Sequence, residues 1–270
     1  MNKKFIVGGC SFTFGHELSD DQDGKVPSKK SWAYGLKEQY GDDYVCAAYP
    51  GSGNSGIARR VFDAVSQNEN IRCVVVMWSF LSRYDWAMPR HRSLEGTRWA
   101  TISPWDTNTG SEEAFRVMRD SEAQSQQWKD RQESFAESGV KDFAESIYKY
   151  AANEYHETYL SWKSIIWLQD ILKKRKIPYL FTLADNSLFY KDFDHRKEQD
   201  PFMTALNNEI DFKKWFTFGE RMMGFNQWAL MNEYDRGTTH PLDQAHRDAV
   251  KLMKPKFKKL IDPLGALGVG

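Results

Sequence analysis

The stretch IVGGCSFTFGHEL, residues 6–18, joins a short apolar run to a glycine turn with a serine at its tip. Residues 4–8 are mostly apolar and end at glycine, which predicts a β-strand. Gly8 and Gly9 permit a tight turn, and Ser11 follows it almost at once. A serine in this position is either an ordinary turn or helix-cap residue or a nucleophile presented at the end of a strand.

The alternation of strand and helix continues along the chain. Further strands are predicted at 43–49, 71–79 and 176–184, and helices at 31–40, 57–67, 142–175 and 241–261, the last with Pro241 in its first turn. This order predicts an α/β fold, a three-layer doubly wound parallel sheet of flavodoxin-like type. Ligands of such sheets bind at the carboxyl ends of the strands, an edge that here would carry Ser11, the Gly53 turn, Ser79 and Asp185.

Two segments depart from this pattern. Residues 80–140 show no clean period, and we interpret them as an insertion after the third strand, part loop and part helix, with the helix at 111–135. Residues 185–235 are irregular and rich in aromatic side chains. Because no repeat or low-complexity linker divides the chain, we expect residues 1–270 to form a single domain.

Composition narrows the classes of partner. The 270 residues include 37 basic and 37 acidic side chains, so net charge gives no reason to expect nucleic acid or a membrane surface as a partner. The chain is rich in aromatic residues, with 10 Trp, 12 Tyr and 17 Phe, and rings in such number are typical of wide contact surfaces. The aromatic-rich insertion is therefore a candidate surface for a protein partner.

The cysteines and the first residues of the chain indicate in which cellular compartment we expect the protein. Cys10, Cys46 and Cys73 lie in or beside apolar runs, which favours free thiols in a reducing compartment. We find no signal peptide and no apolar run long enough to span a membrane, and we expect a cytoplasmic protein, or a virion protein if a phage encodes it. Neither metal-ligand spacing nor a nucleotide-binding glycine motif is present, so we expect no metal and no cofactor.

Three segments, taken together and in order, resemble the SGNH (GDSL-like) hydrolase superfamily. They are GGCSFTFG at 8–15, PGSGNSG at 50–56 and TTHPLDQAH at 238–246. The GCSFT block is similar to the variant first block of small SGNH-like proteins in bacteria and their phages. The resemblance covers most of the chain and implies an SGNH-type fold, with the insertion at about 80–140 as an addition to it.

The resemblance implies a serine esterase that acts on an O-acyl group, for example on an O-acetylated sugar. Ser11 matches the nucleophile, and its backbone N–H matches one oxyanion donor. Gly53 matches the glycine that supplies another N–H, and His240 matches the base that takes the serine proton.

Two expected side chains are missing. The family has an Asn oxyanion donor after the third strand, where this chain reads MWSFLSRYD at 77–85, so Asn54, Ser79 or Ser82 are substitutes. The family has an Asp three residues before the histidine, where this chain has Gly237. Asp235 or Asp185 then orients His240; otherwise Ser11 and His240 form a dyad.

Other residues are candidates for substrate binding. His16 follows Ser11 closely, and Trp78, Arg83 and Trp86 sit where a loop at the carboxyl edge would form a substrate wall, with Arg83 also a source of positive charge. His246 is expected to support packing or to orient the His240 loop. The alternative from another class is a catalytically degenerate binding or structural protein on this fold, for example a phage assembly component.

Overall fold

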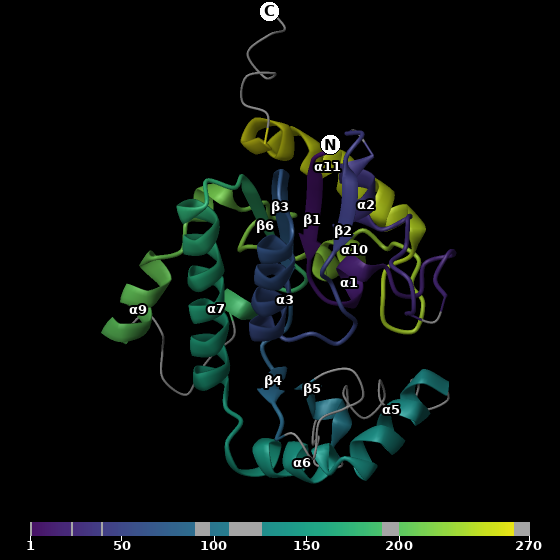
Figure 1. Ribbon diagram of the computed structural model, residues 1–270, viewed down its shortest axis with the longest axis vertical. Helices are drawn as coiled ribbons and strands as arrows, with labels where there is room; N and C mark the ends of the chain where they lie inside the picture. The colour runs from purple at the N-terminus through teal and green to yellow at the C-terminus, as the bar shows by residue number, and fades with distance from the viewer. Residues whose placement is uncertain are drawn as a thin grey trace, which may run out of the picture.

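The computed structural model describes residues 2–22, 24–38, 40–89, 98–107, 126–190 and 200–261. Its main sheet has four strands in the order β2-β1-β3-β6, all parallel (Figure 1). The strands are β1 (Lys4–Gly8), β2 (Asp43–Cys46), β3 (Ile71–Trp78) and β6 (Tyr179–Leu183). The predicted parallel α/β sheet is confirmed, since each strand crosses over to a parallel neighbour through a helical connection.

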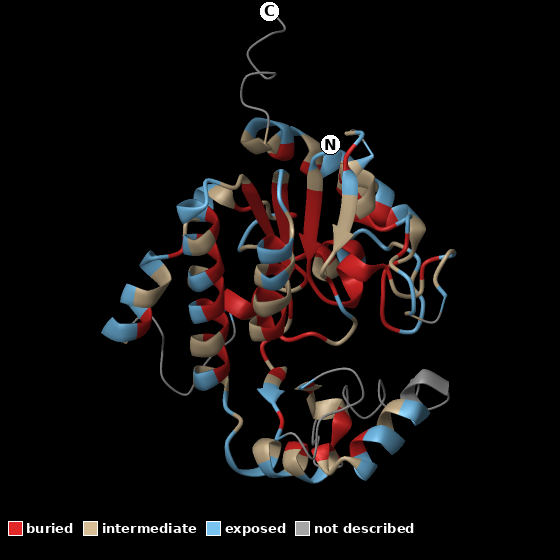
Figure 2. Ribbon diagram, in the orientation of Figure 1, coloured by how far each residue is buried: buried red, intermediate tan, exposed pale blue. Residues whose placement is uncertain are grey.

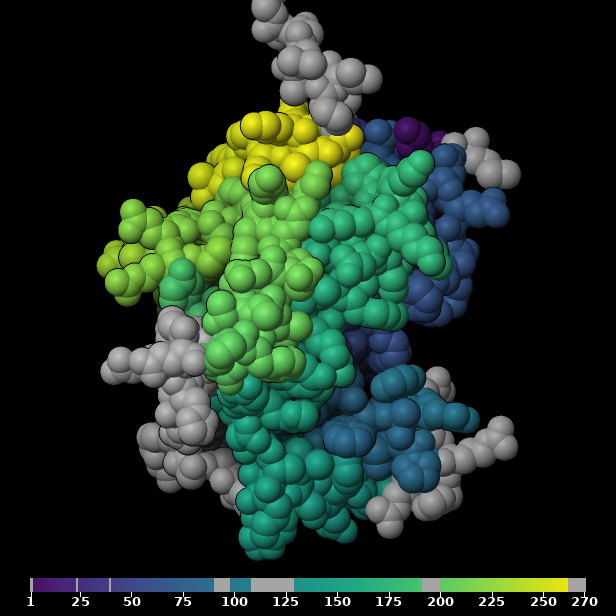
Figure 3. Space-filling model, turned by 90° about the vertical axis from the view of Figure 1, so that its left-hand side faces the viewer, coloured from purple at the N-terminus to yellow at the C-terminus, as the bar shows by residue number. Residues whose placement is uncertain are grey.

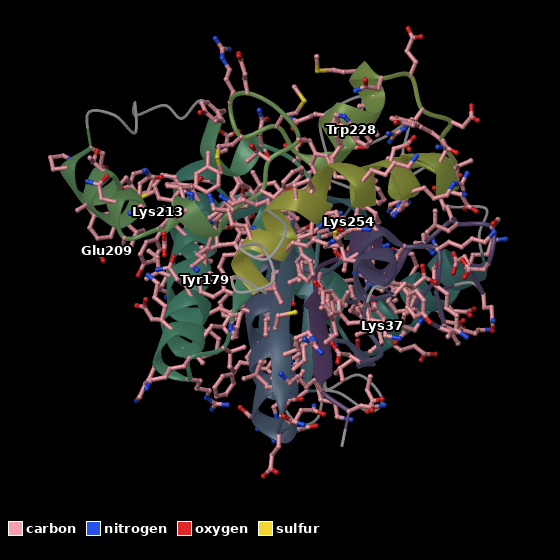
Figure 4. The ribbon with its side chains drawn as sticks, turned by 90° about the horizontal axis from the view of Figure 1, so that it is seen from above. Lys37, Tyr179, Glu209, Lys213, Trp228 and Lys254 are labelled. Atoms are coloured by element: carbon pink, nitrogen blue, oxygen red, sulfur yellow. The ribbon has the colours of Figure 1, made fainter. Side chains whose placement is uncertain are left out.

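Alternate residues of each strand face two separate cores. Ile6 packs on one side of the sheet with α3 (Asn54–Gln67) and α7 (Glu154–Lys174). Phe5 and Val7 pack on the other side with α2 (Trp32–Lys37), α10 (Phe225–Met231) and α11 (Asp243–Ile261). Seen from above, α11 lies between α10, which carries Trp228, and α2, which carries Lys37 (Figure 4).

Burial on both faces explains the β-branched run of the third strand. The residues Cys73 to Trp78 are all 0% exposed. Burial of each such side chain contributes about 1.5 to 3 kcal/mol, which makes these central strands the stable base of the fold. Figure 2 shows β1 and β6 largely in the colour of buried residues, whereas the outer faces of the helices are exposed.

The described residues between β3 and α7 form a lobe below the carboxyl ends of the strands (Figures 1 and 3). It contains an antiparallel hairpin of β4 (Tyr84–Ala87) and β5 (Trp99–Ile102), followed by α5 (Gln126–Glu137) and α6 (Val140–Tyr150). A small core of its own holds it together, formed by Tyr84, Met88, Ala100, Ile102, Phe135, Val140 and Ala144. Most of the helix predicted at 111–135 lies outside the described residues, and the described part is the first section of α5.

The prediction of a single helix at 142–175 is wrong. The chain instead forms α6 and α7, separated by residues 151–153, and Asn153 caps the new helix by accepting a hydrogen bond from the backbone N–H of His156. The break lets the chain turn from the lobe back to the main sheet. Because both helices carry apolar residues at similar spacing, the periodicity alone did not reveal it.

Shorter elements complete the structure. They are the helices α1 (Ser11–Phe14), α8 (Ser187–Tyr190) and α9 (Pro201–Asn208), with 3-10 turns η2 (Pro104–Asp106) and η4 (Phe212–Lys214). The segment 185–235, predicted to be irregular, thus contains α8, α9 and α10. Pro241 precedes α11 rather than lying in its first turn. In the part of the chain that is described, no helix has both the length and the apolar character needed to span a membrane.

Candidate active site

Ser11 lies directly after strand β1 and begins the one-turn helix α1. The turn before it is crowded, because a Cβ added at Gly9 would lie 2.1 Å from Thr13 Oγ1. Only glycine fits there, and this close approach aims the first residues of α1 across the end of the sheet. Ser11 is 6% exposed, so its hydroxyl group is screened from bulk water.

His240 reaches Ser11 from the loop before α11. Its Nε2 lies 2.7 Å from Ser11 Oγ, although 229 positions separate the two residues in the chain. The imidazole ring packs against the ring of Phe12, with centroids 4.7 Å apart. The structure therefore brings together the two residues that the sequence singled out as nucleophile and base, at a distance that permits direct proton transfer.

The other ring nitrogen of His240 faces Glu17. Glu17 Oε2 lies 3.1 Å from His240 Nδ1 and also accepts hydrogen bonds from the backbone N–H groups of Thr239 (3.1 Å) and His240 (2.9 Å). Thr239 Oγ1 is 2.8 Å from the same Nδ1. These contacts favour the tautomer with a proton on Nδ1, which leaves Nε2 free to accept the proton of Ser11.

The electrostatics match these roles. Burial raises the pKa of Glu17, but the hydrogen bonds from His240 and from the two backbone N–H groups outweigh it and hold the pKa at about 2. Burial lowers the pKa of His240, while the hydrogen bond and charge of Glu17 raise it, and the net direction is downward. At neutral pH the pair is therefore a carboxylate and a neutral imidazole, as a general base requires.

Glu17 was missed in the sequence, and Asp235 was predicted in its place. The Asp235 side chain is exposed, and its backbone carbonyl accepts the N–H of Leu242; among the described residues, no hydrogen bond joins its carboxylate to His240. Asp185, the second candidate, accepts the backbone N–H of Ser187 at the start of α8. The sequence does place a carboxylate six positions after Ser11, just past α1, which could have indicated Glu17. The family pattern instead predicts the acid among the residues before His240.

Glu17 is held in position by its loop. Its backbone adopts a left-handed φ of 66°, and its N–H donates to Asp21 Oδ2 at 2.8 Å. A non-glycine residue in this region costs of order 1 to 3 kcal/mol, so the conformation persists only because the surrounding contacts impose it. His16, the preceding residue, places its Nδ1 2.9 Å from the same Asp21 oxygen and packs edge-on against His240, with centroids 5.4 Å apart.

Two backbone N–H groups are candidate oxyanion donors. In the described part of the chain, neither the N–H of Ser11 nor that of Gly53 donates a hydrogen bond. Gly53 precedes the first turn of α3, and a Cβ there would lie 2.5 Å from the backbone oxygen of Arg83. Glycine is thus required at this turn by the close passage of the chain entering the hairpin.

The Asn54 side chain and the backbone N–H of Ser79 do not supply the missing oxyanion donor, while the Ser79 hydroxyl accepts a hydrogen bond from Arg83 Nη1 at 2.9 Å. Asn54 Nδ2 donates to the Ser79 carbonyl (3.2 Å) and to Ser161 Oγ (3.0 Å), and Asn54 Oδ1 accepts the N–H of Ser79 at 2.7 Å. These bonds engage both amide hydrogens of Asn54 and the backbone N–H of Ser79, so none of these groups is free for a substrate. Asn54 instead fastens the start of α3 to the end of β3. The third candidate, Ser82, supplies its backbone carbonyl to the hydroxyl of Tyr148.

Trp78 does not form a substrate wall. Its side chain is 0% exposed and packs edge-on against Phe181 at 5.3 Å in the core beneath α3 and α7. The side chains of β3 alternate between two buried faces, and Trp78 lies on the face covered by α3 and α7. The sequence pattern of a strand buried on both sides does not reveal which face a residue takes. Trp86 is 43% exposed on the hairpin and packs against Phe143.

His246 is a packing residue. Its Nδ1 accepts the backbone N–H of Trp32 at 3.0 Å, and burial lowers its pKa to about 3. The ring therefore remains neutral and links α11 to the start of α2. Cys10, Cys46 and Cys73 are free thiols, and within the ranges described above no three His, Cys, Asp or Glu side chains are arranged to hold a metal ion.

Comparisons with known proteins identify similar structures but no sequence family. No family model matches the chain, and no curated protein matches it in sequence. Similar structures include the psychrotrophic esterase EstA from Pseudoalteromonas sp., with 11% identity over 96% of this chain and 98% of that chain and a TM-score of 0.45.

Two other similar structures carry related descriptions. A member of the lipolytic protein G-D-S-L family from Veillonella parvula has 10% identity, a TM-score of 0.43, and coverage of 96% of this chain and 100% of that one. The SGNH-hydrolase family esterase AlinE4 has 10% identity over 96% of both chains and a TM-score of 0.37. Because these TM-scores lie below 0.5, a function for this chain rests on the geometry of its own site.

Proposed function

We propose that this protein is a serine hydrolase of SGNH type that cleaves a carboxylic ester through Ser11. The observation that supports this proposal is the continuous relay from Ser11 Oγ to His240 Nε2 and from His240 Nδ1 to Glu17 Oε2. A serine hydroxyl is a poor nucleophile until a neighbouring base accepts its proton, and an oriented neutral imidazole supplies that base.

In the proposed reaction, Ser11 Oγ attacks the ester carbonyl carbon while its proton passes to His240 Nε2. The carbonyl π electrons move to the carbonyl oxygen, and the N–H groups of Ser11 and Gly53 stabilise the resulting oxyanion. When the oxyanion collapses, the ester C–O bond breaks and His240 returns the proton to the departing alcohol. A water molecule, deprotonated by His240, then hydrolyses the acyl-serine and regenerates the free Ser11 hydroxyl.

Glu17 serves this cycle as a positioning residue. It keeps the proton of His240 on Nδ1 and stabilises the imidazolium that forms when Nε2 takes the serine proton. The substrate we test first is an O-acetylated sugar, because Trp86, in the hairpin that follows β3, is 43% exposed and an exposed aromatic ring suits contact with a sugar ring.

Labelling with a fluorophosphonate probe tests the proposal. We expect the wild-type protein to be labelled, Ser11→Ala to lose the label, and Cys10→Ala to keep it, since Cys10 is the buried neighbouring nucleophile. Hydrolysis of 4-nitrophenyl acetate should follow the same order. A folded wild-type protein that takes no label and forms a stable higher-order assembly would instead support the binding or structural function.

A further inference from the structure

Arg83 is anchored at the edge of the site by a single nitrogen. Its Nη1 donates to Ser79 Oγ at 2.9 Å and to the Ser52 carbonyl at 3.4 Å, and its guanidinium lies over the Phe80 ring at 5.0 Å. Among the described residues, its Nε and Nη2 groups donate no hydrogen bond. The arginine is half-buried, so these groups form a fixed and partly desolvated donor surface.

Arg83 differs from the structural arginines of this chain. Arg72 holds Asp42 with two hydrogen bonds, and Arg131 holds the fully buried Asp106 in the same two-pronged way. Within the described ranges, no carboxylate lies within ion-pair distance of Arg83. A half-buried cation without an anionic partner favours binding of an external anion.

The position of Arg83 connects it to the proposed nucleophile. Strands β1 and β3 pair with Gly8 opposite Val76, so the residues after the two strands, Ser11 and Ser79, leave adjacent strand ends. Phe80, beneath the guanidinium, packs against Phe12 at 6.0 Å, and Phe12 in turn contacts the His240 ring. The positive charge of Arg83 also lowers the pKa of His240, after the larger effect of burial.

We propose that Arg83 binds a carboxylate carried by the substrate, so that the enzyme prefers esters with a negative charge beside the scissile bond. This inference rests on the proposed function and adds a substrate class to it. The planar guanidinium would donate two parallel hydrogen bonds, from Nε and Nη2, to the two oxygens of the carboxylate. This is the paired geometry in which arginine recognises acids.

Matched pairs of esters test the proposal. The carboxylate lies on the acyl side in 4-nitrophenyl hydrogen succinate, compared with 4-nitrophenyl acetate, and on the alcohol side in 4-acetoxybenzoate, compared with phenyl acetate. For each pair, the measured quantity is the ratio of kcat/KM for the acidic ester to that for the neutral ester. Differences in intrinsic reactivity cancel when variants are compared with the wild type.

We expect Arg83→Gln to lower this ratio about tenfold or more for the pair whose carboxylate reaches Arg83, with the loss mainly in KM. Arg83→Lys, which keeps the charge but not the planar fork, should restore only part of the ratio. Arg175→Gln is the matched control, because Arg175 likewise donates to a backbone carbonyl and a serine and lies over a phenylalanine, and it should leave the ratio unchanged.

The outcomes separate the two proposals. An unchanged ratio in Arg83→Gln for both pairs, in an enzyme that hydrolyses acetate esters, overturns the inference while the proposed function stands. A loss of equal size on acidic and neutral esters also overturns it, because that result indicates a role in the chemistry rather than in carboxylate binding. A wild-type protein without esterase activity or fluorophosphonate labelling counts against the proposed function itself.

Discussion

Glu17 occupies the space in which a side chain at position 237 would lie. A Cβ built on Gly237 would be 2.5 Å from Glu17 Oε2 and 3.0 Å from Glu17 Cδ. The carboxylate that contacts His240 therefore comes from the loop after Ser11, into room left by the absent side chain at 237. In this chain, the glycine before the histidine and the acid after the serine form one complementary arrangement.

Replacement of Glu17 by glutamine tests the importance of its charge. In Glu17→Gln the side-chain oxygen can still accept the backbone N–H groups of Thr239 and His240, so the loop should fold as before. The stabilisation of the imidazolium is lost, and we expect kcat/KM to fall about 100-fold or more. Steady-state kinetics on 4-nitrophenyl acetate measure this, with circular dichroism as the check on folding. Activity close to that of the wild type would indicate a Ser11–His240 dyad.

The shared space also predicts a rescue. Gly237 is not among the glycines with positive φ, so an aspartate can adopt its backbone conformation. We expect Glu17→Ala to be nearly inactive, and Glu17→Ala/Gly237→Asp to recover at least about tenfold in kcat/KM, since the new carboxylate would lie in the vacated space. The control is Glu17→Ala/Gly237→Asn, which has the same shape without charge. Equal activity of the two double variants would argue against an interchangeable acid.

The pH profile of kcat/KM should show opposite shifts for two variants. The base works only when His240 is neutral, and burial lowers the pKa of His240 below its usual value, so we expect the acidic limb to lie below about pH 6.5. Glu17 raises this pKa, so Glu17→Gln should move the limb to lower pH; Arg83 lowers it, so Arg83→Gln should move the limb to higher pH. A limb that does not move in either variant would show that His240 is not the group that titrates.

Glu17 should also leave a signature in stability. Its pKa falls from 4.5 to about 2 on folding, so its contribution to the free energy of unfolding is present above about pH 4.5 and is lost as the pH falls towards 2. We expect the urea midpoint of Glu17→Gln to depend less on pH between 5 and 2 than that of the wild type. Parallel curves for the two proteins would contradict this assignment.

The glycine at position 56 should be required for docking of the hairpin onto helix α3. A Cβ on Gly56 would lie 2.2 Å from Asp85 Oδ1, and Asp85 accepts the Gly56 N–H at 2.9 Å. We expect Gly56→Ala to lower the free energy of unfolding by about 1 to 3 kcal/mol, because overpacking displaces a buried carboxylate. Gly41→Ala is the control, since that position has open space around it. Equal stability of the two variants, measured by urea unfolding, would show that the hairpin can move away from α3 without lowering the free energy of unfolding.

The prediction of the site from sequence succeeded where a residue is fixed by its own strand or helix. Ser11 follows the five-residue strand β1, and His240 lies just before the long amphipathic helix α11. Their separation of 2.7 Å depends on how the loop before α11 packs against the end of the sheet, which the tertiary structure shows. Glu17, by contrast, belongs to a loop with no periodic pattern, and its orientation depends on contacts with Asp21 and with the backbone of residues 239 and 240.

The alternation of apolar strands and amphipathic helices can be read from the order of residues, because residue spacing directly encodes which faces can be buried. This alternation defined the parallel sheet and the edge at which Ser11 lies. Three features required the folded structure: the carboxylate that faces His240, the burial of Trp78 in the core, and the hydrogen bonds by which Asn54 joins β3 to α3. Those outcomes depend on distances between segments remote in the chain, and local sequence carries no record of such distances.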